Sequence, residues 1–204
     1  CICRQITNFS GEIKIFSKDI RKVDKEIFNK FIYSYILKNK LIKTVNDYKL
    51  ERNKIILDKL SKLSKDQNKY VVLGDFNALS PFDAHLYKNS ATLISSKKES
   101  EAKHSHVRNL IDGELEYGVI GSFLGYPLID VAQKFTLKLD DRISCPTQVF
   151  ETEKGLGRHE NSTRIDYILT SPFLAKQCIG SKVLNKEDTY YLSDHYPVVA
   201  EFQL

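Results

Sequence analysis

Apolar side chains first recur at helical spacing within residues 47–66. Ile56, Leu57, Leu60 and Leu63 fall three or four positions apart, while Lys and Asp occupy the positions between them. Such spacing places the apolar groups on one face of a helix and the charged groups on the other. The pattern predicts an amphipathic helix, followed by a polar connection at residues 65–69.

Three later segments show the patterns that are typical of strands. The apolar run at residues 70–73 predicts a short buried strand, and we expect Gly74 to break it. Within residues 164–172 and 197–204, apolar side chains recur at every second position, so these side chains fall on one face of an extended segment. This alternation predicts two half-buried strands. Pro172 ends the first of these two runs.

Between these strands the sequence predicts helix and loop. Ser80, Pro81 and Asp83 supply a hydroxyl cap, a proline and an acid in the order of a helix start. Residues 89–108 are polar and indicate a surface loop or a helix edge, and residues 118–131 indicate a helix that leads into a strand. No repeat or linker divides the chain, so we expect residues 1–204 to form one domain of mixed α and β type.

Composition agrees with one soluble domain. The chain has 204 residues, of which 42% are hydrophobic and 28% charged. A chain of this length can bury a core of its own. No apolar run approaches the roughly 18 to 20 residues that span a membrane, and no signal-peptide pattern opens the chain. We expect a soluble monomer, cytoplasmic or secreted after removal of a signal. The chain starts at Cys1 and contains no Met, so we expect an incomplete N-terminus.

Charge is unevenly distributed along the chain. Residues 1–70 carry 17 Lys and Arg against 8 Asp and Glu, whereas the rest is mildly acidic. A basic segment can follow the phosphates of a nucleic acid, although Lys-rich helices more often present a solvated face. This segment supports an alternative function, a catalytically inactive module that binds nucleic acid or a protein partner through its basic first third.

Polar side chains gather at the ends of the predicted strands. Asp75 and Asn77 follow the first strand, Asp166 lies on the second, and Asp194 with His195 precedes the third. Each alone could serve a turn or a cap. Together, carboxylates converging in one cleft would repel one another unless a cation lay among them, and hard oxygen ligands suit Mg²⁺ or Mn²⁺.

This set of residue types can hydrolyse a phosphoester without a covalent intermediate. A carboxylate orients and deprotonates water, and cationic groups neutralise the charge that grows on the phosphoryl oxygens. If Asp166 holds His195, the imidazole keeps one orientation and protonates more readily, which makes it a donor to a phosphate oxygen.

In this order, three segments closely resemble the C-terminal motifs of the endonuclease/exonuclease/phosphatase superfamily, metal-dependent phosphodiesterases and phosphatases related to DNase I. They are GDFN at 74–77, RIDYIL at 164–169 and SDHYPV at 193–198. LID at 128–130 and CPTQVF at 145–150 are similar to the family's intervening Asp and Thr strands. The resemblance implies a four-layered α/β/β/α sandwich, in which two mixed β-sheets pack face to face with helices outside.

The resemblance also implies a role for each matching residue. Asp75 is similar to the acid that activates the attacking water for in-line attack and binds metal, and Asn77 to the amide that orients the site. Asp194 resembles a metal ligand, and His195 the imidazole that contacts phosphate, buttressed by Asp166. The matching Asp130 and Thr147 would support the site from behind.

The resemblance fails in the first third. The family should supply there a strand ending in Asn, a Glu that is the main metal ligand, and later a His. Neither Glu12 nor Glu26 stands in the expected context, and no His precedes His85. Either segments are absent from this sequence, which we favour, or the chain is a reduced and inactive relative.

The sequence therefore predicts a hydrolase of phosphoester bonds that uses Mg²⁺ or Mn²⁺. Its substrate stays open among nucleic acid, nucleotide, phospholipid and inositol phosphate, because the loops that select among them carry no recognisable motif.

Overall fold

The fold is seen in a computed structural model that describes residues 14–15, 18–19, 45–63, 68–88, 90–104, 109–138, 140–150 and 162–203. Glu12, Glu26 and most of the basic first third lie outside these residues. Within the first third, strands β1 (Lys14–Ile15) and β2 (Lys18–Asp19) form an antiparallel pair.

The longer strands form two small sheets. Strands β3 (Val71–Asp75), β7 (Asp166–Thr170) and β6 (Ile129–Asp130) form one sheet in the order β3-β7-β6. Strands β8 (Cys178–Val183) and β9 (Val198–Phe202) form the other. Every pair is antiparallel in the described part of the chain, so the parallel pairing of a mixed sheet is not seen there.

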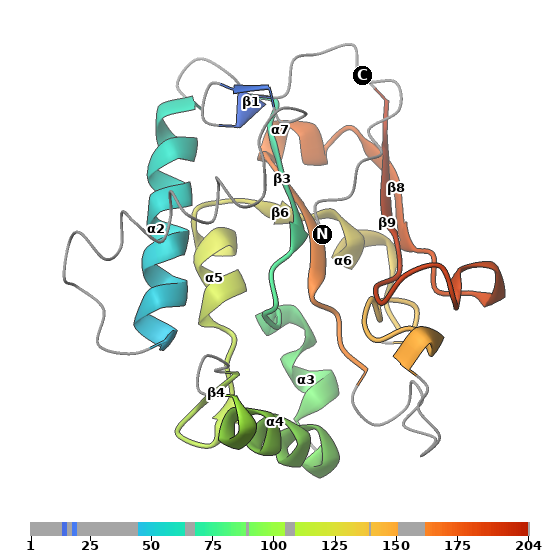
Figure 1. Cartoon of the computed structure of the whole chain (residues 1–204). Helices are drawn as coiled ribbons and strands as arrows, with labels where there is room; N and C mark the ends of the chain where they lie inside the picture. The colour runs from blue at the N-terminus through green and yellow to red at the C-terminus, as the bar shows by residue number, and fades with distance from the viewer. Residues whose placement is uncertain are drawn as a thin grey trace.

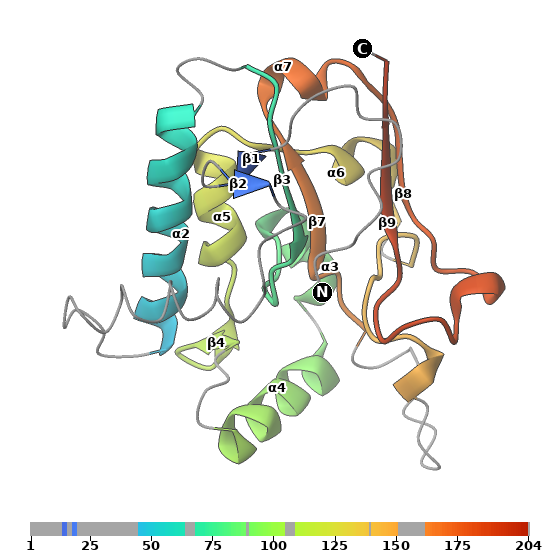
Figure 2. The ribbon, with the colours of Figure 1, turned by 45° about the horizontal axis from the view of Figure 1, so that its top comes forward.

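Helices α2 (Val45–Leu63) and α5 (Gly118–Gly125) lie together on one side of the three-stranded sheet, and the β8–β9 pair lies on its other side (Figures 1 and 2). The apolar face of α2 packs there as its spacing predicts, with Leu60 buried beside Phe123 and Tyr167. The amide of Asn53 donates to the Val119 carbonyl at 2.9 Å and so ties the two helices together.

These layers confirm the predicted mixed α/β class. Three layers are visible as helix, sheet and sheet, with α6 (Val131–Phe135) between β7 and β8 (Figure 1). Helices outside the second sheet, the fourth expected layer, do not fall among the described residues. Nor does the described part contain a helix long and apolar enough to cross a membrane.

Several local predictions need correction. Gly74 does not break the first strand: its φ of +139° is open to glycine, and pairing continues through Gly74 to the register of Asp75 with Asp166. Residues 91–103 of the polar stretch form a helix, α4 (Ala91–Lys103), capped by Ser90. A hairpin of β4 (Leu110–Ile111) and β5 (Glu114–Leu115) follows it.

The helix start after the first motif is confirmed. The Ser80 hydroxyl accepts from the Phe82 amide at 3.2 Å and caps a 3-10 turn, Pro81–Asp83, that leads into α3 (Ala84–Tyr87). Asp83 is fully buried, so its partners lie inside the protein, as described below. Downstream, α7 (Pro172–Ala175) begins where Pro172 ends β7.

Candidate active site

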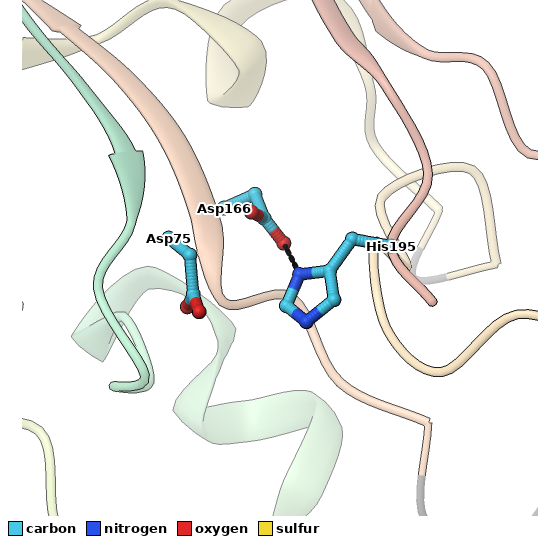
Figure 3. Close-up of side chains that lie close together, drawn as sticks. All are labelled: Asp75, Asp166 and His195. Atoms are coloured by element: carbon cyan, nitrogen blue, oxygen red, sulfur yellow. Dashed lines mark hydrogen bonds and ion pairs between the residues drawn. The ribbon is translucent and has the colours of Figure 1, made fainter. Parts of the chain in front are cut away.

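Two of the expected acids meet where β3 and β7 lie side by side. Asp75 is the last residue of β3 and Asp166 the first of β7, and the antiparallel register pairs them directly. His195 approaches from the loop that precedes β9, so three distant segments converge (Figure 3). One ligand atom from each of these residues lies within 4.8 Å of the other two.

A hydrogen bond fixes the imidazole within this group. His195 Nδ1 lies 2.8 Å from Asp166 Oδ2, and both side chains are largely buried, with 23% and 14% exposed (Figure 3). The bond to Asp166 raises the pKa of His195 to about 10, and the nearby Cys145 side chain acts in the same direction, against the effect of burial. The imidazole is therefore a cation and a proton donor at neutral pH.

Asp75 is held by the turn that follows it. The backbone amide and the side-chain amide of Asn77 each donate to its carboxylate at 2.8 Å, and Asn77 adopts a φ of 48° that closes this turn. Burial raises the pKa of Asp75, while the Asn77 amide opposes that rise and Asp166 adds to it. A carboxylate with a raised pKa is a better base than an ordinary surface aspartate.

Asp194 does not join this group. Its side chain is exposed, and Oδ1 accepts from the Ser193 hydroxyl at 3.0 Å. Among the described residues, the second carboxylate of the group is Asp166, whereas the sequence suggested Asp194 as the metal ligand beside Asp75. Asp194 and His195 are consecutive residues of a bend before β9, and of the two only His195 belongs to the group found among the described residues. A metal-binding role for Asp194 stays a prediction.

Thr147 supports the loop that carries His195. It is buried; its hydroxyl donates to the Ser193 carbonyl, and its backbone amide donates to the Asp194 carbonyl at 3.2 Å. Thr147 was expected on a strand, but it lies between an isolated bridge at Cys145 and a 3-10 turn, Gln148–Phe150. Its contacts agree with support from behind the site.

Ser144 joins the two halves of the site and was missed in the sequence. Its buried hydroxyl accepts from the backbone amides of Ile165 and Asp166 at 3.1 and 3.2 Å. Its carbonyl accepts from the amide of Tyr196 at 2.8 Å. Ser144 therefore holds the backbone of Asp166 and that of Tyr196, the residue after His195. A serine beside a predicted motif carries no local signal of that role.

Asp130 belongs to a buried network of four charges behind the site. Arg164 contacts Asp83 through Nε at 2.7 Å and Asp130 through a second nitrogen at 2.6 Å, and Arg142 contacts the other oxygen of Asp83 at 2.7 Å. The side chains are between 0% and 5% exposed. Two cations balance two anions, which is how buried charge is tolerated. Arg164 also stacks on Tyr167, 4.6 Å from the ring centroid.

The donor chemistry of the clustered residues fits a divalent metal. Two carboxylates from paired strands supply hard oxygen ligands, and the repulsion between them that helps raise the pKa of Asp75 would be relieved by a cation. His195 is poorly suited to bind a metal, because a protonated imidazole has no free lone pair. Asp75 and Asp166 are thus the carboxylates that the structure places together.

Solved structures resemble part of this chain at low sequence identity. No curated protein matches the chain. Among solved structures, a 3′-5′ exonuclease from Neisseria meningitidis is 20% identical to this chain with a TM-score of 0.48. The alignment covers 78% of this chain and 53% of the exonuclease. A 3′ phosphatase from Neisseria bound to a product DNA hairpin is 20% identical with a TM-score of 0.47, over the same shares of the two chains. An AP endonuclease from Archaeoglobus fulgidus is 22% identical with a TM-score of 0.42, over 76% of this chain and 56% of its own.

The chain thus spans about half the length of these proteins. The model of the Endonuclease/Exonuclease/phosphatase family matches residues 26–195, which include GDFN, RIDYIL, the first three residues of SDHYPV, and the converging Asp75, Asp166 and His195. With most of its length matched and these motifs meeting at one point, the chain belongs to the endonuclease/exonuclease/phosphatase family.

Proposed function

We propose that the protein hydrolyses phosphoester bonds with a divalent metal ion, by in-line attack of an activated water. The observation that carries the proposal is the convergence of Asp75, Asp166 and His195, with one ligand atom of each inside 4.8 Å. Such a group combines a base with a fixed cationic donor, which are the two needs of this chemistry.

Each residue then has a defined task. Asp75, whose pKa burial raises, orients the attacking water and takes its proton. The protonated His195, whose pKa Asp166 raises to about 10, donates a hydrogen bond to a phosphoryl oxygen. Asn77 keeps Asp75 in position through two hydrogen bonds of 2.8 Å.

Asp75 and Asp166 would hold the metal, with Asp194 as a further ligand on the basis of its motif. When bound, Mg²⁺ or Mn²⁺ would supply charge neutralisation at the phosphoryl oxygens. The inactive alternative, a binding module, is less well supported, because the hydrogen bonds that hold Asp75 and His195 are intact.

A substrate panel with matched variants tests the proposal. The full polypeptide is assayed on DNA, RNA, nucleotides, phospholipids and inositol phosphates with Mg²⁺, with Mn²⁺ and with EDTA. We expect divalent-dependent hydrolysis that falls by at least about a hundredfold in Asp75→Asn and His195→Gln. Asp112→Asn in the exposed β4–β5 turn and His85→Gln on α3 make the same chemical changes outside the group and serve as controls.

Two outcomes would overturn it. One is the absence of hydrolysis on every substrate in the presence of divalent ions. The other is hydrolysis that persists unchanged in both Asp75→Asn and His195→Gln, since the activity would then arise elsewhere.

A further inference from the structure

The two strands that carry Asp75 and Asp166 separate just beyond these residues. The last backbone hydrogen bond that the described residues show between the two strands runs from the Phe76 amide to the Ile165 carbonyl at 2.9 Å. Past that bond one chain turns away at Asn77, where φ is 48°. The spacing of the two carboxylates therefore depends on how the diverging chain ends are held.

The hydroxyl of Tyr167 joins these diverging ends. Tyr167 pairs with Gly74 in the ladder, and because successive side chains of a strand alternate, its ring lies on the face away from the carboxylates. Its hydroxyl reaches past the pair of aspartates and contacts the carbonyl of Ala78 at 3.0 Å and that of Arg164 at 2.8 Å. A phenol has one hydrogen to donate, so the two carbonyls share it.

The ring of Tyr167 is also fixed in place. Tyr167 is 1% exposed. Phe76 meets its ring edge-on with centroids 5.7 Å apart, and the Arg164 guanidinium lies 4.6 Å from its centroid. Burial raises the pKa of Tyr167 well above its ordinary value, so the hydroxyl keeps its hydrogen. The phenol is thus a fixed donor between the two chain ends.

Each of the two carbonyls belongs to a segment that fixes one carboxylate. Ala78 follows Asn77, whose backbone and side-chain amides both donate to the carboxylate of Asp75. Arg164 precedes Asp166 by two residues. A change at the phenol hydroxyl should therefore reach both carboxylates.

A second buried tyrosine contacts only one of the two ends. The hydroxyl of Tyr87 on α3 accepts from the backbone amide of Arg164 at 3.1 Å, which is its one hydrogen bond among the described residues. Tyr87 is 2% exposed, so it matches Tyr167 in residue type and in burial. The two tyrosines differ in that only Tyr167 also holds the end that carries Asp75.

We propose that Tyr167 is a positioning residue, which sets the separation of the Asp75 and Asp166 carboxylates that would hold the metal. The inference rests on the proposed function and deepens it, because it gives a part in metal affinity to a side chain that acts through the backbone behind the site. Metal binding without substrate measures that part directly.

Binding of Mn²⁺ to the full polypeptide, followed by electron paramagnetic resonance without substrate, tests the proposal. We expect Tyr167→Phe to weaken Mn²⁺ binding at least about tenfold, the usual cost of losing a group that supports metal ligands from behind. Tyr87→Phe removes a hydroxyl from the Arg164 end alone, so its Mn²⁺ binding should stay close to that of the wild type. Equal weakening in the two variants would overturn the proposal, since neither hydroxyl would then act on the separation.

Thermal unfolding separates a positioning role from a structural one. Each variant loses one buried hydroxyl, so both midpoints should fall by a similar amount, about 2 to 4 °C. A midpoint that falls much further in Tyr167→Phe than in Tyr87→Phe would overturn the assignment, because the hydroxyl would then hold the fold instead of the site.

The metal dependence of hydrolysis gives a further readout. For an active preparation, Tyr167→Phe should raise the Mn²⁺ concentration of half-maximal activity at least about tenfold and leave the substrate KM at saturating Mn²⁺ unchanged. A lower rate with an unchanged metal requirement would contradict the assignment.

Asp75→Asn is the reference that separates this inference from the proposed function. If Asp75→Asn leaves Mn²⁺ binding unchanged, the metal is not held at this group, and the proposed function fails together with the inference. If Asp75→Asn weakens Mn²⁺ binding and Tyr167→Phe does not, only the role of Tyr167 fails.

Discussion

His195 Nδ1 lies 2.8 Å from Asp166 Oδ2, across a sequence separation of 29 residues. This bond joins the loop before β9 to the first residue of β7 and raises the pKa of the imidazole to about 10. The hydrogen bond keeps His195 protonated, as the proposed chemistry requires, and it also contributes to the stability of the fold.

The first prediction concerns the dependence of stability on pH. The folded-state pKa of His195, about 10, lies above its unfolded value of about 6.5. The folded state therefore binds more protons between these values, and the contribution to stability is complete below pH 6.5 and lost as pH rises through 10. Asp166→Asn should remove this contribution, of the order of 1 to 2 kcal/mol.

Denaturant titrations of the wild type and Asp166→Asn in EDTA, between pH 6 and pH 10, measure the effect. The difference between the two unfolding free energies should be largest at the acid end and shrink toward pH 10. A difference that stays constant across this range would contradict the assignment of the proton to the His195–Asp166 pair.

A second prediction follows from the raised pKa of Asp75. Burial disfavours its charged form, so Asp75→Asn should leave the free energy of unfolding unchanged or raise it by up to about 1 kcal/mol. The new amide keeps one oxygen to accept from Asn77. The same variant should bind Mn²⁺ more weakly, measured by electron paramagnetic resonance, because it removes a proposed ligand.

Asp130→Asn is the informative comparison for Asp75→Asn. Both changes replace a carboxylate with an amide, but Asp130 faces Arg164 at 2.6 Å inside the buried network. Asp130→Asn should therefore destabilise the protein where Asp75→Asn does not. Equal losses of stability in the two variants would show that Asp75 is a structural residue.

Much of this arrangement follows from local sequence patterns. The helix within 47–66 and the strands at 70–73, at RIDYIL and at PVVAEF are predicted because their side-chain periodicity is local, and the structure has a helix at Val45–Leu63 and strands at these three places. The convergence of Asp75, Asp166 and His195 also followed from their places near strand ends, once the motifs were taken in order.

Other parts depend on tertiary contacts that no local pattern encodes. Strand β8 was missed because CIGSKV contains Gly180 and Lys182 and lacks clean alternation. The pairing of Arg142 with Asp83 spans 59 residues.

Ser144 provides a third prediction. Ser144→Ala would leave the amides of Ile165 and Asp166 without their acceptor, which costs about 2 kcal/mol of stability. Because those amides fix the start of β7, kcat should fall as well. Ser181→Ala removes a hydroxyl that donates to Val199 between β8 and β9, so it should reduce stability and leave kcat unchanged. A normal kcat in Ser144→Ala would limit Ser144 to stability.

The last prediction concerns Arg164, which holds two buried acids. Arg164→Met would leave Asp83 with Arg142 and would remove the cation that faces Asp130, and a buried carboxylate without its partner costs about 3 to 5 kcal/mol. Arg164→Lys should not restore the loss, because a single ammonium cannot meet both carboxylates and stack on Tyr167 as the planar guanidinium does.

Arg142→Met is the matched control, since Asp83 would keep its contact with Arg164 and the loss should be smaller. In chemical denaturation the free energy of unfolding should be highest for the wild type, lower for Arg142→Met, and lowest for Arg164→Lys and Arg164→Met. A loss below about 1 kcal/mol in Arg164→Met would mean that water reaches the two acids and that the network does not anchor the strand. Because Arg164 precedes Asp166 by two residues, the loss of that anchor should also loosen the His195–Asp166 bond, and the alkaline fall in stability should then flatten in Arg164→Met as it does in Asp166→Asn.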